Sequence, residues 1–166
     1  MNQSIASLVQ TLSGLLEKSS IKIALAESCT GGLLAAHLTA QAGSSLWFDR
    51  GFVTYSNASK TESIGVSSSI IEQYGAVSEE VAKAMAQGAL NHSAAKTSIA
   101  ITGIAGPGGS TENKPVGMVC FAWAVQFPGS PALLIASTQI FDGGRQAIRE
   151  HACAYALNEL IQILRK

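Results

Sequence analysis

The spacing of hydrophobic residues in the first forty positions predicts a helix, a strand and a second helix. Apolar side chains recur every three or four residues between positions 4 and 18, which is typical of an amphipathic helix with one buried stripe. The run 21–26 has the length and composition of a short buried strand. After Gly31 and Gly32, a leucine-rich segment predicts a second helix that ends near Ala40.

The middle of the chain predicts one strand and three helices. Residues 47–55 are rich in aromatic and β-branched side chains, which favour a strand. Each of the three helices follows a residue of a type that caps helix N-termini: Ser56 or Asn57, Ser67 and Ser78. The third helix extends to about Asn91, and two glutamates in its first turn suit the positive end of the helix dipole.

The last third of the chain predicts three strands and a long helix. Strands are expected at 97–102, 116–127 and 132–141, with a Pro-Gly-Ser-Pro turn that makes the last two a hairpin. An apolar stripe predicts a helix over 145–164. Strands that alternate with helices, followed by a hairpin, indicate an α/β fold with a mixed sheet. We therefore expect residues 1–166 to form one domain, a three-layer α/β/α sandwich.

Composition and charge narrow the class of function. Hydrophobic residues make up 47% of the chain and charged residues 13%, and the 11 basic side chains balance the 11 acidic ones. Basic residues do not cluster among aromatic ones, so nucleic acid is not an expected partner. A surface poor in charge is compatible with a homodimer, although charge alone is weak support for one.

Cysteine usage and the N-terminus point to the cytoplasm. The three cysteines, Cys29, Cys120 and Cys153, are an odd number without metal-type spacing, which favours reduced thiols. The first twenty residues lack the basic segment and continuous apolar run of a signal peptide. No run reaches the roughly 18 apolar residues that a membrane span requires, so no membrane partner is expected.

Three loops that follow predicted strands are candidates for a binding site. They are residues 28–32, 103–110 and 143–145, each containing glycine. In open α/β sheets, ligands bind in the crevice beyond the carboxyl ends of the strands, where these loops would converge. Glycines let a ligand approach the backbone, and helix N-termini offer unpaired amides to an anion. For any single loop, a simple turn is the commoner explanation.

Several kinds of site are excluded by the pattern. The loop after Thr102 lacks the Gly-x-x-x-x-Gly-Lys-Ser/Thr spacing of a phosphate-binding loop, and no helix directly follows its glycines. The chain has two aspartates and three scattered histidines without ligand spacing, so we expect neither a metal nor another cofactor. A Ser-His-Asp triad would require tertiary contacts that the sequence does not suggest.

A serine and a lysine remain as nucleophile and base. Ser28 lies at a strand-to-helix turn where its hydroxyl can be presented rigidly, although such a serine also commonly caps a helix. Lys60 lies in the first turn of a helix, whose dipole disfavours its charge, so an uncharged amine there could accept the Ser28 proton. Two competitors are the Ser93–Lys96 spacing of penicillin-recognising enzymes and the thiol of Cys29. The other motifs of penicillin-recognising enzymes do not accompany Ser93 and Lys96. Cys29 is next to Ser28 in the chain, and adjacent residues do not easily face the same pocket.

Five segments, in order over about 22–155, resemble the CinA carboxy-terminal domain family. They are Ala-Glu-Ser-Cys-Thr-Gly-Gly at 26–32, Gly-Phe-Val-Thr-Tyr-Ser-Asn at 51–57 with Lys60, Gly-Ala-Val-Ser at 75–78, Thr-Gly-Ile-Ala-Gly-Pro at 102–107 and Lys-Pro-Val-Gly at 114–117. Several motifs in register are far more specific than any one of them. The chain departs from the family at Ser110, where many members have glycine. If the backbone at this position needs a positive φ, serine would restrict the loop 103–110, so the part of this loop in binding is less firmly implied.

The resemblance implies hydrolysis of the carboxamide of nicotinamide mononucleotide to nicotinic acid mononucleotide and ammonia. It assigns Ser28 as nucleophile, Lys60 as base and Tyr55 as an aid to proton transfer. The substrate-binding positions that it implies are Gly31, Gly32, Ser44, Thr102, Gly106 and Arg145, the last as a phosphate partner. Two alternatives stay open: a non-catalytic ligand-binding or regulatory module, which the family's historical link with competence and DNA damage invites, and an amidase for another small carboxamide.

Overall fold

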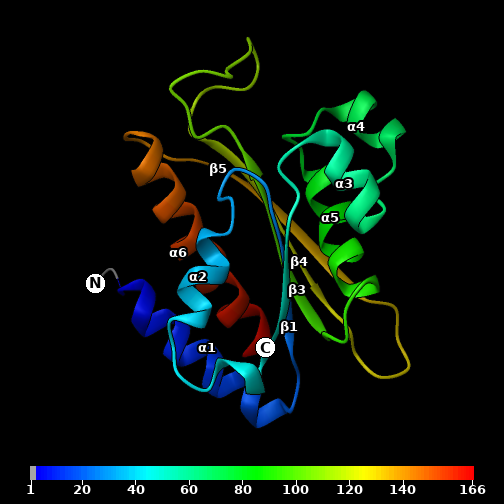
Figure 1. Ribbon diagram of the computed structural model, residues 1–166, viewed down its shortest axis with the longest axis vertical. Helices are drawn as coiled ribbons and strands as arrows, with labels where there is room; N and C mark the ends of the chain where they lie inside the picture. Colours follow the sequence, from blue (N-terminus) through cyan, green and yellow to red (C-terminus); the bar gives the residue numbers. More distant parts are fainter. Residues whose placement is uncertain (1–2) are drawn as a thin grey trace.

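A five-stranded mixed sheet forms the centre of the protein (Figure 1). The computed structural model describes residues 3–166. The strands lie in the spatial order β2 (Phe48–Val53), β1 (Ile23–Glu27), β3 (Thr97–Gly103), β4 (Met118–Val125) and β5 (Leu133–Ile140). β1 pairs in parallel with β2 and β3, whereas β4 pairs antiparallel with β3 and β5. The predicted mixed sheet with a late hairpin is confirmed.

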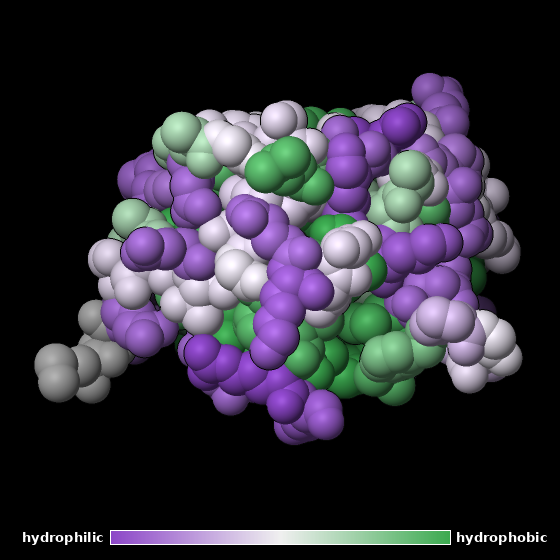
Figure 2. Space-filling view, turned by 90° about the horizontal axis from the view of Figure 1, so that it is seen from below, coloured by the Kyte–Doolittle hydropathy of each residue, from purple (hydrophilic) through white to green (hydrophobic). Residues whose placement is uncertain are grey.

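Helices cover both faces of this sheet. One layer contains α1 (Ile5–Ser19), α2 (Leu33–Thr39) and α6 (Arg145–Leu164), and the other contains α3 (Asn57–Ile64), α4 (Ser68–Tyr74) and α5 (Glu79–Asn91). A short 3-10 helix, η1 (Ser44–Leu46), precedes β2. The α/β/α sandwich expected from the sequence is therefore confirmed. Viewed from below, hydrophobic residues gather in one region of the surface among polar ones (Figure 2).

The two faces of the sheet carry side chains of different size. The face toward α1 and α6 is built from large residues, among them Leu25, Phe121 and Trp123. Every buried strand residue in the cluster on the α5 face is small: Ala24, Ala26, Ala100, Cys120, Ala122 and Ala124. Because small side chains fill little space, α5 packs close to the sheet, where the Ser98 hydroxyl donates to the Ala86 carbonyl at 2.7 Å.

The element boundaries differ from the predictions where caps and turns intervene. Ile21 was predicted in the first strand, but its amide donates to the Leu16 carbonyl and closes the end of α1 beyond Ser20, which has a φ of 54°. β4 is shorter than predicted at its start because Gly117, with a φ of 94°, turns the chain there. The long helix begins and ends at the predicted residues, Arg145 and Leu164.

Gly88 and Gly14 provide a test of the close packing of α5. A Cβ at Gly88 would overlap the carbonyl oxygen of Ile64 at the end of α3, whereas a Cβ at Gly14 in α1 would meet nothing within 4 Å. Gly88→Ala should therefore lower the free energy of unfolding by about 1–3 kcal/mol through overpacking. Gly14→Ala should raise it by up to about 1 kcal/mol through helix propensity. Urea unfolding measures both, and equal stabilities for the two variants would contradict the packing described.

Candidate active site

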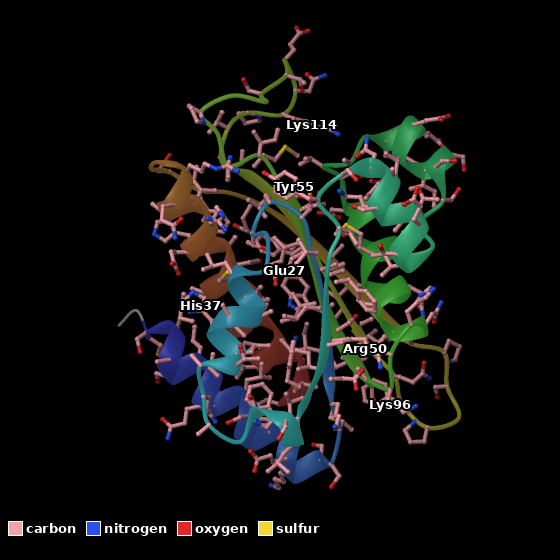
Figure 3. The ribbon with its side chains drawn as sticks, viewed as in Figure 1. Glu27, His37, Arg50, Tyr55, Lys96 and Lys114 are labelled. Carbon is pink, nitrogen blue, oxygen red and sulfur yellow. The ribbon has the colours of Figure 1, made fainter. Side chains whose placement is uncertain are left out.

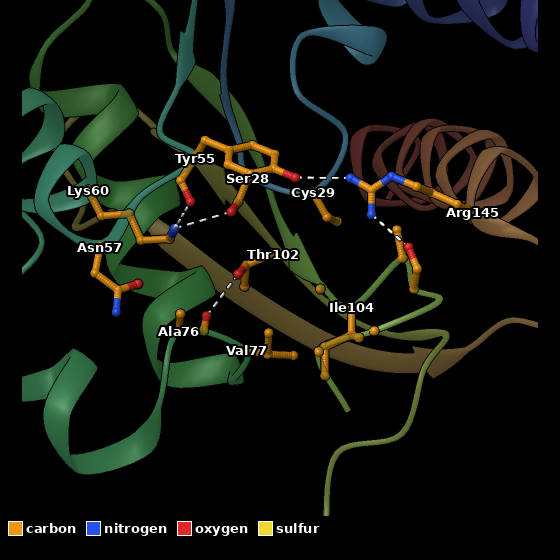
Figure 4. A pocket seen from close by; sticks show the side chains of 15 residues that line it. Ser28, Cys29, Tyr55, Asn57, Lys60, Ala76, Val77, Thr102, Ile104 and Arg145 are labelled. Atoms are coloured by element: carbon orange, nitrogen blue, oxygen red, sulfur yellow. Dashed lines mark hydrogen bonds between the residues drawn. The ribbon is translucent and has the colours of Figure 1, made fainter. Parts of the chain in front are cut away.

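A cavity of about 280 Å³ lies beyond the carboxyl ends of β1 and β3 (Figure 4). Its lining includes Ser28, Thr102, Gly106 and Arg145, so the three loops predicted to converge do meet here. Figure 4 shows Lys60 entering the cavity from α3 on one side and Arg145 from the start of α6 on the other. The site thus combines residues from both helical layers.

The amine of Lys60 contacts the hydroxyl of Ser28. Lys60 Nζ donates to Ser28 Oγ at 3.1 Å and to the carbonyl of Thr54 at 2.9 Å, with a longer contact to the carbonyl of Tyr55 at 3.4 Å. The lysine is only 1% exposed, and within residues 3–166 no carboxylate forms an ion pair with it. Burial therefore lowers the pKa of Lys60. The arrangement favours an uncharged amine beside a hydroxyl.

Local structure fixes the position of each partner. Ser28 follows directly after β1, and its amide donates to Ile101 of β3 at 2.9 Å, which ties the start of the loop to the sheet. The preceding Glu27, which lies at the centre of the molecule (Figure 3), is 1% exposed. Its carboxylate accepts from the amides of Leu34 and Ala35 at 2.9 and 3.1 Å. Glu27 therefore caps α2, whose own N-cap, Gly32, has no side chain to do so.

Helix α3 presents the lysine through its own cap. The Ser56 hydroxyl accepts from the amide of Ser59 at 3.1 Å, so Ser56 rather than Asn57 is the N-cap of the two candidates. Lys60 is one turn further along, and its amide donates to the carbonyl of Ser56 at 3.3 Å. The lysine side chain points back over the N-terminus toward β1, as side chains on helices lean.

Tyr55 and Arg145 form the opposite side of the cavity. The guanidinium of Arg145 donates to the Gly106 carbonyl at 2.8 Å and to the Tyr55 hydroxyl at 3.0 Å. The hydroxyl of Tyr55 thus faces Arg145, and its carbonyl rather than its hydroxyl lies near Lys60 (Figure 4). Arg145 joins the loop after β2 to the loop after β3.

The other predicted binding residues are placed differently. Thr102 lines the cavity, and its hydroxyl donates to the carbonyl of Ala76 at 2.8 Å. Gly31 and Gly32 shape the turn between β1 and α2 with φ values of 56° and 99°, and they stand outside the lining. Ser44 lies in η1, before β2, and the structure does not bring it to this cavity. Because β2 runs parallel to β1, the residues before β2 lie at the opposite end of the sheet.

The lining also contains residues that sequence reasoning did not single out. Asn57 opens α3 and was considered only as a cap, while Ala76 and Val77 come from the segment between α4 and α5. Small apolar residues carry no chemical signature, so only the motif at 75–78 pointed to this segment. Arg149, one turn after Arg145, was also missed, and it binds the loop after Ser28. Its spacing of four from Arg145 is the signal that was available.

The two competing nucleophiles are less well placed. Cys29 does line the cavity beside Ser28, contrary to the expectation that neighbours would not share it, but burial raises the pKa of its thiol to about 12. Ser93 donates its hydroxyl to the Ala89 carbonyl at 2.6 Å. Lys96 is exposed at the other end of the sheet from Tyr55 (Figure 3). The Ser93–Lys96 spacing therefore forms no site.

Several remaining features bear on the type of site. Positive φ angles in the loop after β3 fall on Gly106 and Gly109, and Ser110 does not adopt one, so the serine fits the backbone as it stands.

All three cysteines are buried and unpaired. Across residues 3–166, no group of three or more His, Cys, Asp or Glu side chains could hold a metal ion. No helix in this part of the chain is long and apolar enough to cross a membrane.

The lowered pKa of Lys60 makes a prediction about stability. Between that lowered pKa and the ordinary lysine value of about 10.4, the unfolded chain holds more protons than the folded one, so stability rises with pH. Lys60→Met removes this dependence. The free energy of unfolding of the wild type minus that of the variant should therefore increase as the pH rises toward the ordinary lysine value of about 10.4. Urea unfolding at several pH values measures it, and a flat or falling difference would mean that the folded protein keeps Lys60 charged.

Comparisons with known proteins agree on one family. The model of the CinA C-terminal domain matches residues 5–164. The chain is 49% identical to nicotinamide-nucleotide amidohydrolase PncC of Enterobacter agglomerans, over 84% of this chain and 83% of that one. It is 42% identical to the Pseudomonas putida protein of the same name, over 96% of each. A CinA-like protein of Mycolicibacterium paratuberculosis is 52% identical over 86% of this chain, which spans only 33% of that longer protein.

Solved structures give the same result. The competence or damage-inducible protein from Enterobacter asburiae superposes with a TM-score of 0.91 at 34% identity, over 98% of this chain and 99% of that one. The competence/damage inducible protein from Agrobacterium tumefaciens superposes with a TM-score of 0.89 at 40% identity, over the whole of both chains. The family match covers nearly all described residues, including every element that builds the cavity. The chain belongs to the CinA C-terminal domain family.

Proposed function

We propose that this protein hydrolyses the carboxamide of nicotinamide mononucleotide, releasing ammonia and nicotinic acid mononucleotide, with Ser28 and Lys60 as a catalytic dyad. The observation that carries the proposal is the buried contact between Lys60 Nζ and Ser28 Oγ, in a cavity without a competing carboxylate. The amidohydrolase name of two relatives that match most of this chain supports the substrate.

The first half of the reaction forms an ester on Ser28. The uncharged amine of Lys60 takes the hydroxyl proton as Ser28 Oγ attacks the carboxamide carbon, giving a tetrahedral intermediate with a negatively charged oxygen. The Lys60 ammonium then returns the proton to the departing nitrogen, and the C–N bond breaks. Ammonia leaves, and the nicotinoyl group of the ribotide remains bound to the serine oxygen.

The second half regenerates the enzyme. A water molecule replaces ammonia beside Lys60 and gives up a proton to the amine as its oxygen attacks the ester carbon. The bond from that carbon to Ser28 Oγ then breaks, and Lys60 protonates the serine oxygen. One base thus serves both steps, and the buried lysine needs no metal or other cofactor for either.

Substrate binding is assigned to the side of the cavity opposite the dyad. Arg145 opens α6, whose N-cap, Gly144, makes no side-chain cap, so the guanidinium and the helix N-terminus together suit a phosphate. The exposed ring of Tyr55 stands at the mouth, where it could orient the pyridine ring. Its hydroxyl binds Arg145, so proton transfer by Tyr55 stays a prediction. Thr102 and Gly106, which line the cavity, complete the proposed binding set, whereas Gly31 and Gly32 contribute by shaping the turn that follows Ser28.

The same geometry argues against two alternative functions. A binding or regulatory module has no use for a buried lysine that contacts a hydroxyl, which favours catalysis. An amidase for another carboxamide would not need a cation at the far side of the cavity from the dyad. A cytoplasmic location, where pyridine nucleotides and reduced thiols occur together, is part of the proposal.

A substrate panel tests the function. Ammonia release should be fastest from nicotinamide mononucleotide, slower from the riboside that lacks the phosphate, and slowest from free nicotinamide, since each truncation removes binding energy. In the same assay Ser28→Ala and Lys60→Ala should each remove most of the turnover, and the double variant should be little worse than either. Turnover should rise with pH through the lowered pKa of Lys60, because only its uncharged form accepts a proton.

Cys29→Ser is the matched control, since it changes a neighbouring side chain that lines the same cavity, and it should stay substantially active. Near-normal turnover by Ser28→Ala, or loss of activity only in Cys29→Ser, would refute the dyad. Faster turnover of free nicotinamide than of the mononucleotide would refute the substrate.

A further inference from the structure

Asn57 is a polar residue of the cavity lining that has no part in the two reaction steps described above. It is the first residue of α3, and Figure 4 shows its side chain on the Lys60 side of the cavity, away from Arg145. Because Ser56 caps the helix, the Asn57 amide group is not needed for capping. The residue is exposed, and its side chain forms no hydrogen bond within residues 3–166. Its donor and acceptor groups are therefore free to bind a ligand.

The other polar side chains of the lining already contact protein groups. The hydroxyls of Ser28 and Tyr55 accept from the two basic side chains of the lining. The hydroxyl of Thr102 donates to a backbone carbonyl. The thiol of Cys29 has no such partner, but a thiol is only a weak hydrogen-bonding group. The Asn57 amide is thus the one strong hydrogen-bonding side chain in the described lining that no protein group satisfies.

Asn57 lies one helical turn before Lys60. Residues three apart on a helix share a face, and long side chains on a helix lean toward its N-terminus. Lys60 Nζ accordingly reaches the carbonyls of Thr54 and Tyr55, which lead into α3, at 2.9 and 3.4 Å. The amine of the proposed base therefore lies over the first turn of the helix, close to the residue that opens it.

The leaving group of an amide needs more than a proton donor. In the tetrahedral intermediate, the departing nitrogen carries N–H groups and a lone pair, and the lone pair must face Lys60 to receive its proton before the C–N bond breaks. Protonation places positive charge on the nitrogen, which strengthens any hydrogen bond that its N–H groups donate. An acceptor beside Lys60 would therefore bind the transition state more tightly than the uncharged substrate.

An acceptor at this position has to be uncharged. A carboxylate beside Lys60 would stabilise the ammonium form, which cannot take the proton of Ser28. The remaining titratable groups of the lining are Cys29, Tyr55 and Arg145, none of which is a carboxylate. The carbonyl oxygen of an asparagine side chain accepts a hydrogen bond while adding no charge.

We propose that Asn57 binds the leaving nitrogen of the substrate carboxamide, with its Oδ1 accepting an N–H and holding the nitrogen lone pair toward Lys60. The inference rests on the proposed function and adds to it a residue that makes the site favour amides over esters. The proton still passes from Lys60 to the nitrogen, the C–N bond breaks and ammonia leaves, and Asn57 is unchanged at the end.

A comparison of amide and ester substrates tests this role. The methyl ester of nicotinic acid mononucleotide has the same acyl group, but its leaving oxygen carries no hydrogen. Asn57→Ala should lower kcat/KM for the carboxamide about tenfold to hundredfold, as expected for a hydrogen bond to a charged group, and should change it less than about twofold for the ester. Deacylation, which the two substrates share, does not enter kcat/KM. Glu62→Ala, exposed in the same helix and outside the lining, should match the wild type on both substrates.

An isotope effect and a second variant show whether the loss arises at the nitrogen. The heavy-nitrogen isotope effect on kcat/KM should rise in Asn57→Ala, because breaking the C–N bond becomes more rate-limiting. Asn57→Asp keeps an acceptor and suits a helix N-terminus, so this variant should fold. Its charge should raise the pKa of Lys60 and move the rising limb of the pH profile to higher pH for both substrates, whereas Asn57→Ala should leave that limb in place.

The outcomes separate this inference from the choice of substrate. If the wild type ignores the mononucleotide but hydrolyses another carboxamide of the panel, that amide and its methyl ester are compared instead. A loss confined to the amide would then support Asn57 while refuting the substrate. Unchanged amide turnover in Asn57→Ala, or equal losses for amide and ester with an unchanged isotope effect, would overturn the role of Asn57 and leave the proposed function intact. A wild type that hydrolyses no carboxamide would overturn both.

Discussion

The contact between the buried amine of Lys60 and the hydroxyl of Ser28 is the constraint on which the rest of the site depends. An ammonium ion sealed from water without a carboxylate is strongly unfavourable, so the protein favours the neutral amine and satisfies it with the carbonyl of Thr54 and with Ser28. A carboxylate nearby would stabilise the pair but keep the lysine charged and unable to accept a proton. The proposed base catalysis therefore depends on a cavity whose described lining contains no carboxylate.

Holding this contact requires the carboxyl ends of neighbouring strands to be rigid. Glu27 places its buried charge against the amides at the start of α2, which fixes the loop on one side of Ser28. Arg149 binds the same loop from α6, and Arg145 fastens the loop after β3 to Tyr55. Charged side chains thus bind backbone groups around the cavity, while burial disfavours the charged form of Lys60.

Hydrophobic periodicity, together with residues of the type that cap helices, was sufficient to predict the sheet and its helices, because both faces of the sheet are buried. The chemistry of Ser28 and Lys60 followed from residue type, and the family resemblance brought the two together; spacing in the sequence could not, since they are 32 positions apart. Ser44 is a position implied by the family resemblance that the structure does not bring to this cavity. It belongs to a segment before β2, and parallel pairing sends that segment to the far end of the sheet. The spacing of four from Arg145 places Arg149 on the same side of α6, but its partners are backbone carbonyls, which leave no mark in a sequence, so its contacts could not be predicted.

The position of the cavity follows from the order of the strands. The chain leaves β1 through α2 on one face of the sheet and leaves β2 through α3, α4 and α5 on the other, so the loops above these adjacent strands diverge. Such a divergence opens a crevice at the carboxyl ends, where ligands of open α/β sheets bind. Here the first loop supplies Ser28 and the second supplies Tyr55 and then Lys60. The proposed nucleophile and its proposed base therefore approach the crevice from opposite sides, which lets them touch across 3.1 Å while leaving the space above them open to a ligand.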